Sequence, residues 1–155
     1  MKQSAGILLY RISEKRLEFF LVHPGGPFFQ NKDVGWWSVP KGEIPPDEKP
    51  IDTAIREFDE ETGYKPSGNF IVLNPVVQKG GKQVFCWAVK GDLDPKVITC
   101  NTFELEWPPK SGKMKAFAEV DKGGWFTYEE AKRLINEKQV SFLNEFTHLH
   151  SNAVC

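Results

Sequence analysis

The sequence predicts an α+β fold, and three observations carry this prediction. Two apolar runs near the start, separated by a short polar turn, indicate a hairpin of strands. Residues 50–63 instead carry their apolar side chains at the spacing of a helix. Thirteen glycines and eleven prolines among 155 residues imply many turns, which argues against a bundle of helices.

The first half of the chain is expected to place one helix between two hairpins. Strands are expected at four places: 5–11, 17–23, 70–78 and 83–89. A loop, a short extended segment and a Pro-rich turn are expected to lead from the first hairpin to the helix: 24–35, 36–40 and 41–50. The helix begins at Pro50 and ends at Gly63, because proline suits a first helical turn and glycine suits a C-terminal cap.

The second half is expected to add a strand, an extended segment and two helices. The strand, the extended segment and the final helix are expected at 103–107, 125–126 and 140–150. Thr127 caps the other helix, which continues through Asn136, and Glu130 completes a capping box. Residues 1–155 contain neither an internal repeat nor a linker, so we expect a single domain.

The charge balance and the cysteines exclude several classes of partner. Twenty Lys and Arg residues face 21 Asp and Glu residues, whereas a nucleic-acid binder usually shows a basic excess. DNA is therefore excluded and RNA disfavoured, while a local basic pocket for phosphates stays open. No apolar stretch is long enough for a signal-peptide core or a membrane span. Three scattered cysteines, Cys86, Cys100 and Cys155, fit a reducing cytoplasm rather than a disulfide framework.

The helix at 50–63 carries two distinct faces. Glu57, Glu60 and Glu61 lie side by side, because residues three and four positions apart share one face of a helix. The apolar residues cover a separate face: Ile51, Ala54, Ile55 and Phe58. Repulsion between neighbouring like charges costs only about 0.2 to 0.5 kcal/mol per pair, so energy does not decide what the cluster does. Taken alone, such a cluster is more often solvated surface than a metal site.

The residues around this helix reverse that interpretation. Seven positions form a spaced pattern: Gly42, Glu48, Arg56, Glu57, Glu60, Glu61 and Gly63. This pattern resembles the signature of the Nudix hydrolases. Phe58 and Tyr64 depart from it mildly, because the family usually has a bulky aliphatic residue at these places. The run from Trp37 to Gly42, Trp-Ser-Val-Pro-Lys-Gly, is also similar to the family, and the likeness covers about residues 4–137.

The resemblance implies an α/β/α sandwich with a mixed β-sheet, one central catalytic helix and C-terminal helices. It also implies an enzyme that hydrolyses a nucleoside diphosphate linked to another group, with Mg²⁺ as cofactor and Mn²⁺ as a substitute. A polyanionic substrate approaches a carboxylate cluster only when divalent cations lie between them. The implied metal ligands are the backbone carbonyl of Gly42 and three carboxylates: Glu57, Glu60 and Glu61.

Further motif residues are implied to support this site. Arg56 is expected to orient Glu57 through a charge-assisted hydrogen bond. Glu48 is expected to support the loop before the helix. Gly42 and Gly63 are expected to allow the turns that bracket the helix.

The general base is implied less sharply than the metal ligands. In some relatives the glutamate that matches Glu57 serves as the base, and in others a later glutamate outside the motif does. We favour Glu119 as the later candidate, because it stands six residues before Trp125, a spacing similar to that in several family members. Glu104 and Glu106 are its rivals on the preceding strand.

Substrate contacts are expected from aromatic and basic residues beside the motif. Trp36 and Trp37 are candidates to stack on a nucleobase, and Lys41 is a candidate to contact phosphates, although aromatic side chains more often fill a core. Further candidates of the same kinds are Phe28, Phe29, Trp107, Lys110, Lys113 and Lys115.

The first choice of substrate is a dinucleoside polyphosphate. Diadenosine tetraphosphate, cleaved to a nucleoside triphosphate and a monophosphate, is favoured because the Trp37 to Gly42 run resembles the diadenosine tetraphosphate hydrolase branch. Nucleoside triphosphates and sugar nucleotides are alternative substrates. A non-catalytic nucleotide-binding module and an RNA-decapping enzyme are alternative functions. The expected state is a cytoplasmic monomer or homodimer.

Overall fold

The computed structural model describes residues 2–154, which form one large sheet, a small sheet and three α-helices. The strands of the large sheet are β1 (Gln3–Ser13), β2 (Arg16–Pro24), β3 (Lys41–Glu43), β4 (Ile71–Gln78), β5 (Lys82–Lys90) and β8 (Val120–Thr127). Their order is β4-β5-β1-β2-β8, with β3 paired to β1. The pair β1 and β5 is parallel and the other pairs are antiparallel, so the sheet is mixed, as predicted.

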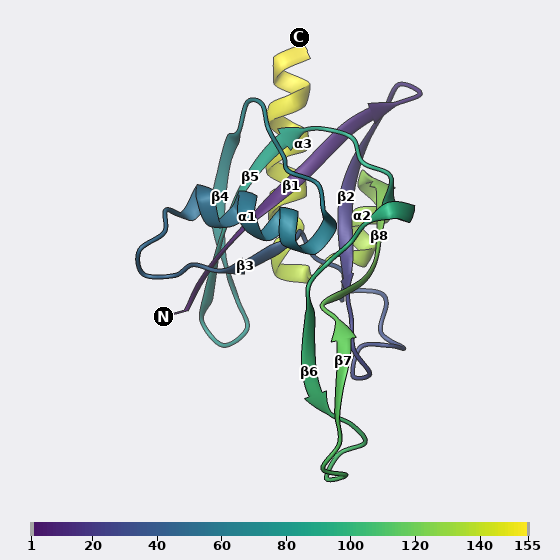
Figure 1. Ribbon diagram of the computed structural model, residues 1–155. Helices are drawn as coiled ribbons and strands as arrows, with labels where there is room; N and C mark the ends of the chain where they lie inside the picture. The colour runs from purple at the N-terminus through teal and green to yellow at the C-terminus, as the bar shows by residue number, and fades with distance from the viewer. Residues whose placement is uncertain (1, 155) are drawn as a thin grey trace.

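Helices cover both faces of the large sheet (Figure 1). Side chains of a strand point to opposite faces in turn, so neighbours along β1 enter different cores. Leu8 packs with α2 (Tyr128–Leu134) and α3 (Val140–Val154), whereas Ile7 and Leu9 pack on the side of α1 (Pro50–Thr62). The predicted α/β/α sandwich is therefore confirmed.

The central helix α1 has the predicted bounds and caps. Pro50 stands in its first turn, and Gly63 ends it in the left-handed region at φ 82°. The Gly63 N–H donates to the carbonyl of Asp59 at 2.7 Å, which satisfies a carbonyl that the helix end would leave unpaired. Phe58 is fully buried against Phe20, with ring centroids 5.9 Å apart. Ala54 and Phe58 thus pack on the sheet as expected, whereas Ile51 and Ile55 of the predicted apolar face are only half-buried, and Ile55 lines a surface pocket.

The late helices agree with the sequence except at their ends. The Thr127 side chain accepts the Glu130 N–H and the Glu130 carboxylate accepts the Thr127 N–H, so the predicted capping box is present. Helix α2 ends at Leu134 rather than Asn136, and a short 3₁₀ helix, η2 (Glu137–Gln139), follows it. Helix α3 is longer than the expected 140–150.

Three strands differ from the sequence prediction. The short strand β3 lies where a polar turn was expected, because Lys41 and Gly42 pair with β1. Strand β7 (Met114–Ala118) was not predicted, since its side chains are mostly exposed and lack a buried alternation. Strand β8 begins well before the predicted segment 125–126, because its polar and glycine-rich start is held by backbone pairing with β2.

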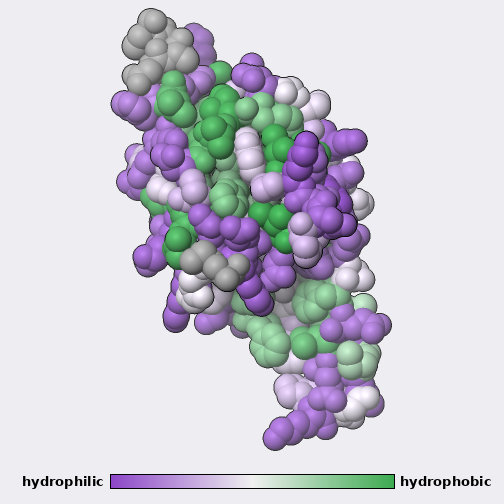
Figure 2. Space-filling view, turned by 90° about the vertical axis from the view of Figure 1, so that its left-hand side faces the viewer, coloured by the Kyte–Doolittle hydropathy of each residue, from purple (hydrophilic) through white to green (hydrophobic). Residues whose placement is uncertain are grey.

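Strands β6 (Thr102–Glu106) and β7 form a separate arm that projects from the body (Figure 1). The space-filling view shows the same arm with hydrophobic and hydrophilic residues side by side on its surface (Figure 2). Its base adjoins the loop after β2, where the ring of Phe103 lies against Gly26. Within residues 2–154, no helix has the length and apolar character needed to cross a membrane.

Candidate active site

The first wall of the candidate site is formed by β3 and α1 and is called the helix wall. A side-chain carbon added to Gly42 would lie 2.1 Å from the carboxyl carbon of Glu57. A larger residue at this place would therefore displace the Glu57 carboxylate from its position. This contact puts the Gly42 backbone and the Glu57 carboxylate together, as the proposed metal site requires.

Arg56 connects the carboxylates of the helix wall. Its guanidinium donates two hydrogen bonds to Glu48, at 3.0 and 2.9 Å. One further nitrogen donates to Glu57 at 3.2 Å and to Glu60 at 3.0 Å. The hydrogen bonds from Arg56, followed by one from Thr53, lower the pKa of Glu48 to about 2. Arg56 thus lies against Glu57 in the position expected for an orienting residue, and Glu48 holds Arg56.

Glu61 is the buried member of the carboxylate cluster. Its side chain is 8% exposed, and its Oε2 atom has no hydrogen-bond partner among the described residues. Burial and then the neighbouring Glu57 raise the pKa of Glu61 to about 9, while Lys41 acts in the opposite direction. Burial and then Glu60 also raise the pKa of Glu57. Lys41 offsets the cost of burying this carboxylate only in part, and a bound divalent metal ion would stabilise the ionised form further.

The donor types, carboxylates and a backbone carbonyl, suit a divalent metal ion, but the structure does not gather the carboxylates into a ligand cluster. Among residues 2–154, no three acidic, His or Cys side chains are grouped so that they could hold a metal ion. Arg56 contacts both Glu57 and Glu60, so a metal ion would compete with its guanidinium for these two carboxylates. Hard oxygen ligands of this kind are the ones that Mg²⁺ prefers.

The second wall lies opposite and is called the loop wall; it consists of residues 23–36 and 118–121. Between the walls is a cavity of about 170 Å³, called the carboxylate cavity, lined by Val22, Pro24, Trp36, Ser38, Val39, Lys41, Glu61, Glu119 and Val120. Glu119 and Glu61 thus face the same space from different walls. The rival glutamates lie on the arm, and neither lines this cavity: Glu104 and Glu106.

A second cavity of about 310 Å³, called the amide cavity, adjoins the first. The two share four lining residues: Pro24, Trp36, Ser38 and Lys41. The amide cavity adds aromatic and amide side chains, among them Phe29, Gln78, Asn136 and Gln139. Trp36 is 44% exposed, so its ring is open to a ligand. Lys41 and Trp36 therefore stand where both cavities meet.

Trp37 lines the amide cavity but is mostly buried and also belongs to the core. It is only 5% exposed, and its Nε1 donates to the Asp33 carboxylate at 2.8 Å. Its ring packs edge-on against Phe126, with centroids 5.0 Å apart. Trp37 therefore offers a ligand much less surface than its neighbour Trp36, which is 44% exposed.

The remaining aromatic and lysine candidates lie farther along the loop wall and the arm. Phe29 contacts Trp36, and Phe28 packs edge-on against Trp107 of the arm with centroids 5.6 Å apart. The arm lysines line neither cavity: Lys110, Lys113 and Lys115. Phe28 remains 60% exposed in this pair.

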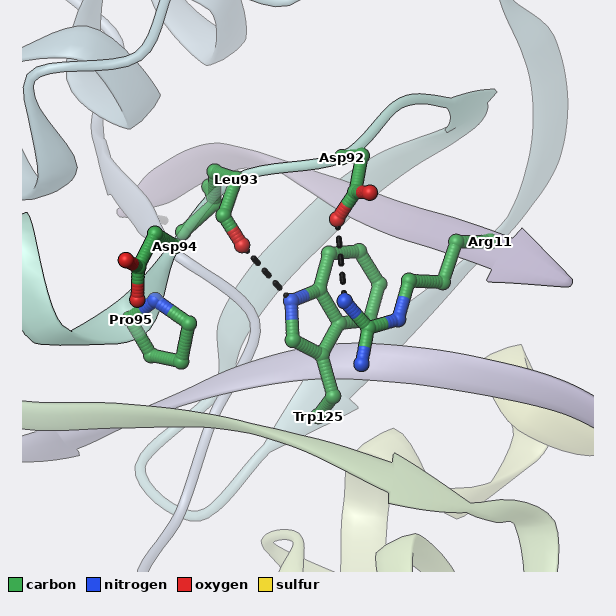
Figure 3. A pocket seen from close by; sticks show the side chains of 6 residues that line it. All are labelled: Arg11, Asp92, Leu93, Asp94, Pro95 and Trp125. Carbon is green, nitrogen blue, oxygen red and sulfur yellow. Dashed lines mark hydrogen bonds and ion pairs between the residues drawn. The ribbon is translucent and has the colours of Figure 1, made fainter. Parts of the chain in front are cut away.

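A surface pocket of about 530 Å³ (Figure 3) is lined by none of the motif residues. There the Arg11 guanidinium lies over the Trp125 ring, 4.3 Å from its centroid, and Trp125 donates to the Leu93 carbonyl. Arg11 also pairs with Glu18 and Asp92, both at 2.9 Å. Its charge is therefore already satisfied, and this pocket contains no carboxylate of the motif.

Sequence reasoning missed two residues of the loop wall, His23 and Asp121. The His23 ring is fully buried, and its Nδ1 atom lies 2.9 Å from Asp121 Oδ1. The two residues are 98 positions apart, so no local spacing pattern relates them. The only sequence signal was a histidine ending an otherwise apolar strand.

A model of the NUDIX domain family matches residues 2–146. The chain belongs to the NUDIX family. This match confirms the resemblance to the Nudix hydrolases that the motif from Gly42 to Tyr64 gives. The family description names no substrate, whereas some individual relatives are named after theirs.

Individual relatives agree with this membership. The asymmetrical bis(5'-nucleosyl)-tetraphosphatase of Rattus norvegicus is 28% identical over 97 residues, which span 55% of this chain and 62% of the rat protein. The Ap4A hydrolase of C. elegans, solved as a binary complex, is similar with a TM-score of 0.70 and 21% identity, over 98% of this chain and 99% of that one. The NUDIX domain of Shewanella oneidensis NrtR, solved with ADP ribose, has a TM-score of 0.63 and 17% identity, over 94% and 86%. At these identities the solved structures establish the fold.

Proposed function

We propose that this NUDIX protein is a Mg²⁺-dependent pyrophosphohydrolase that cleaves diadenosine tetraphosphate to a nucleoside triphosphate and a monophosphate. The observation that carries the proposal is the pair of adjoining cavities. Glu61 and Glu119 face one of them, and Trp36 and Lys41 connect it with the other. A nucleotide needs this combination of a site for the reacting phosphate and an adjoining site for a base.

In this proposal the helix wall holds the divalent cofactor. Glu57, Glu60, Glu61 and the Gly42 carbonyl are its ligands. When bound, the metal neutralises phosphate charge and favours ionisation of the attacking water. Arg56 holds Glu57 and Glu60 in place, and Glu48 fixes Arg56 through two hydrogen bonds. The role of this wall is therefore to attract and orient the phosphates.

The loop wall supplies the base in the same proposal. Glu119 takes the proton of the attacking water as the new bond from water oxygen to phosphorus forms. The bond from that phosphorus to the bridging oxygen breaks, and the bridging oxygen leaves on the other product. Lys41 lies between the two cavities, where its ammonium group would meet the departing phosphate.

The choice of a dinucleoside substrate rests on two aromatic sites. Trp36 in the amide cavity offers one exposed ring, and Phe28 with Trp107, which follows the outer end of β6, offers a second. Base stacking on an aromatic side chain contributes about 1 to 3 kcal/mol for each base. The name of the rat relative, an asymmetrical tetraphosphatase, supports the same choice.

A broad nucleoside triphosphatase is the second candidate, and one observation favours it. The Phe28 and Trp107 pair lines neither cavity, so the protein has one enclosed aromatic site instead of two. In that case a single base and its phosphates would fill the two cavities.

A substrate panel in Mg²⁺ separates these functions. We expect the highest kcat/KM for diadenosine tetraphosphate, compared with ATP, GTP, ADP-ribose and a capped RNA, with products identified by chromatography. A preference for any mononucleotide would transfer the assignment to the second candidate. No hydrolysis of any member of the panel would contradict the enzymatic proposal and leave a nucleotide-binding module.

A further inference from the structure

His23 is a fully buried residue that the proposed reaction does not use. It lies at the end of β2, and both of its ring nitrogens face oxygen atoms. Nδ1 lies 2.9 Å from the Asp121 carboxylate, and Nε2 lies within hydrogen-bond distance of the Lys32 backbone carbonyl. Its ring also packs edge-on against Trp37, with centroids 5.4 Å apart.

Both oxygens can only accept hydrogen bonds. A backbone carbonyl has no proton to donate, and an ionised carboxylate has none either. A neutral imidazole carries a single N–H, so it would leave one ring nitrogen with its lone pair against an acceptor. The two contacts are both satisfied only when both nitrogens carry protons, which makes the ring an imidazolium balanced by Asp121.

The two acceptors belong to different segments of the loop wall. Lys32 lies in the loop that leads to Trp36, and Asp121 stands two residues after Glu119. A third connection joins the same segments, because the Gly25 N–H donates to the Glu119 carbonyl at 2.9 Å. A side-chain carbon on Gly25 would lie 2.0 Å from the Ala118 carbonyl oxygen, so the two segments are in direct contact.

The other charged groups nearby are directed to different partners. The Lys32 ammonium lies over the Trp36 ring at 5.6 Å, and the Lys122 ammonium lies over the Trp37 ring at 5.7 Å. Asp33 accepts the hydrogen bond from Trp37. Asp121 is therefore the charged group that contacts the His23 ring.

We propose that His23 is a positioning residue for the hydrolysis: its doubly protonated ring ties the Trp36 loop to the strand that follows Glu119 and so fixes both groups around the substrate. This inference rests on the proposed function, because it assigns His23 a role in that reaction. His23 touches neither substrate nor metal in this role and acts through Glu119 and Trp36.

The charge state is tested first, on the protein without any ligand. In a ¹⁵N-labelled sample near pH 7, long-range ¹H–¹⁵N correlation spectra should show one histidine with both ring nitrogens protonated. That signal should be absent from His23→Phe. A ring with one unprotonated nitrogen at position 23 would overturn the proposal.

The positioning role is tested by kinetics on the best substrate of the panel. His23→Phe keeps a buried ring without its hydrogen bonds and should lower kcat/KM by about tenfold or more, because small displacements of reacting groups cost that much. Asp121→Ala should behave alike, and Asp121→Asn should retain severalfold more activity, since its amide can donate to an unprotonated Nδ1. Leu143→Ala in α3 is the control for loss of stability alone.

A double-mutant comparison then separates positioning from general weakening of the fold. In the wild type, Glu119→Gln should lower kcat/KM by about 100-fold, the scale of a lost general base. In the His23→Phe background the same change should cost less than about tenfold, because Glu119 is already misplaced. Should His23→Phe fail to fold, Asp121→Ala takes its place.

Each outcome distinguishes this proposal from the proposed function. Equal losses from Glu119→Gln in both backgrounds would overturn the positioning role while hydrolysis of the nucleotide stands. A wild type whose activity does not need Glu119 would overturn both the base assignment and this inference. Absence of hydrolysis across the whole panel would instead contradict the proposed function, and it is seen before any variant is made.

Discussion

The two walls of the candidate site are built in opposite ways. The helix wall is held by contacts between residues close in sequence, since Arg56 binds Glu48 eight positions away and Glu60 four positions away. The loop wall is held by contacts across the chain, since His23 and Asp121 are 98 positions apart. The helix wall carries a cluster of carboxylates, whereas the loop wall pairs the fully buried His23 ring with the partly exposed carboxylate of Asp121.

The two walls also differ in when they can form and in what they contribute to the reaction. The helix wall can form its charge cluster as soon as α1 exists, because the spacing on the helix brings the carboxylates together. The loop wall exists only after β2 and β8 have paired, because its groups come from both strands. Changes to the helix wall should therefore act on the reaction itself, and changes to the loop wall other than at Glu119 on the binding and placement of substrate.

The largest expected effect is the removal of the metal ion. Exhaustive chelation should abolish hydrolysis, because Glu57, Glu60 and Glu61 repel a polyphosphate when no cation lies between them. Activity should return when Mg²⁺ is added back. Unchanged turnover in the chelated protein would show that the helix wall has no metal-binding role.

Substituting a single carboxylate of the helix wall should have the next largest effect on activity. Glu57→Gln and Glu61→Gln keep the side-chain shape and remove a metal-binding charge, so each should lower kcat by about 100-fold or more. Circular dichroism should show both variants folded. Asp59→Asn is the matched control, because Asp59 is exposed on the same helix. Wild-type turnover by both variants would make the cluster ordinary surface.

Phe58→Ala tests the side of α1 that faces the sheet. Phe58 is fully buried, and loss of a buried phenylalanine typically lowers the free energy of unfolding by about 3 to 5 kcal/mol. Thermal or denaturant unfolding should show this loss, while the exposed change Asp59→Ala should have little effect. A fall in activity with unchanged stability would mean that the two faces of α1 are wrongly assigned.

On the loop wall, Trp36→Leu should change binding more than chemistry. Removing the exposed ring should raise KM by about tenfold, within the 1 to 3 kcal/mol of a stacked base, and leave kcat within severalfold. Val34→Ala serves as the control because Val34 is exposed in the same loop. An unaltered KM would remove Trp36 from the substrate site.

The smallest effect concerns the pH dependence of stability in the metal-free protein. Burial and Glu57 raise the pKa of Glu61 to about 9, above the ordinary value of 4.5 for a glutamate. Between these values the folded state binds more protons than the unfolded state, so stability should fall as pH rises. Glu61→Gln should reduce this loss of stability, so that raising the pH to 8 lowers the Tm of the variant by several degrees less than that of the wild type. Equal slopes in both proteins would contradict the assigned environment of Glu61.

The helix wall was predictable from the sequence because its determinants are local. Pro50 and Gly63 mark the ends of α1, and the spacing of its glutamates places them on one face. The carboxylate contacts of Arg56 also follow from positions within one helix and the turn before it.

The loop wall could not be predicted in the same way. The start of β8, Asp121-Lys122-Gly123-Gly124, has no strand preference of its own and becomes a strand only by pairing with β2. The partner of His23 lies in this same segment, so the contact depends on a pairing that no local pattern reveals. The burial of the two adjacent tryptophans could not be predicted either, because Trp36 is 44% exposed and its sequence neighbour Trp37 only 5%.

The parallel pairing of β1 with β5 has a consequence for folding during synthesis. Strand β1 pairs with β2 directly after it in the chain, but Gln3 meets Gln83, 80 positions later. Until β5 leaves the ribosome, the first hairpin has an unpaired apolar edge in the middle of what becomes the sheet. Such long-range parallel pairing forms slowly, and unpaired edges of this kind attract other chains. The β1 edge therefore stays open to pairing with other chains until β5 is made, and the outer edge of β2 stays open until β8 is made.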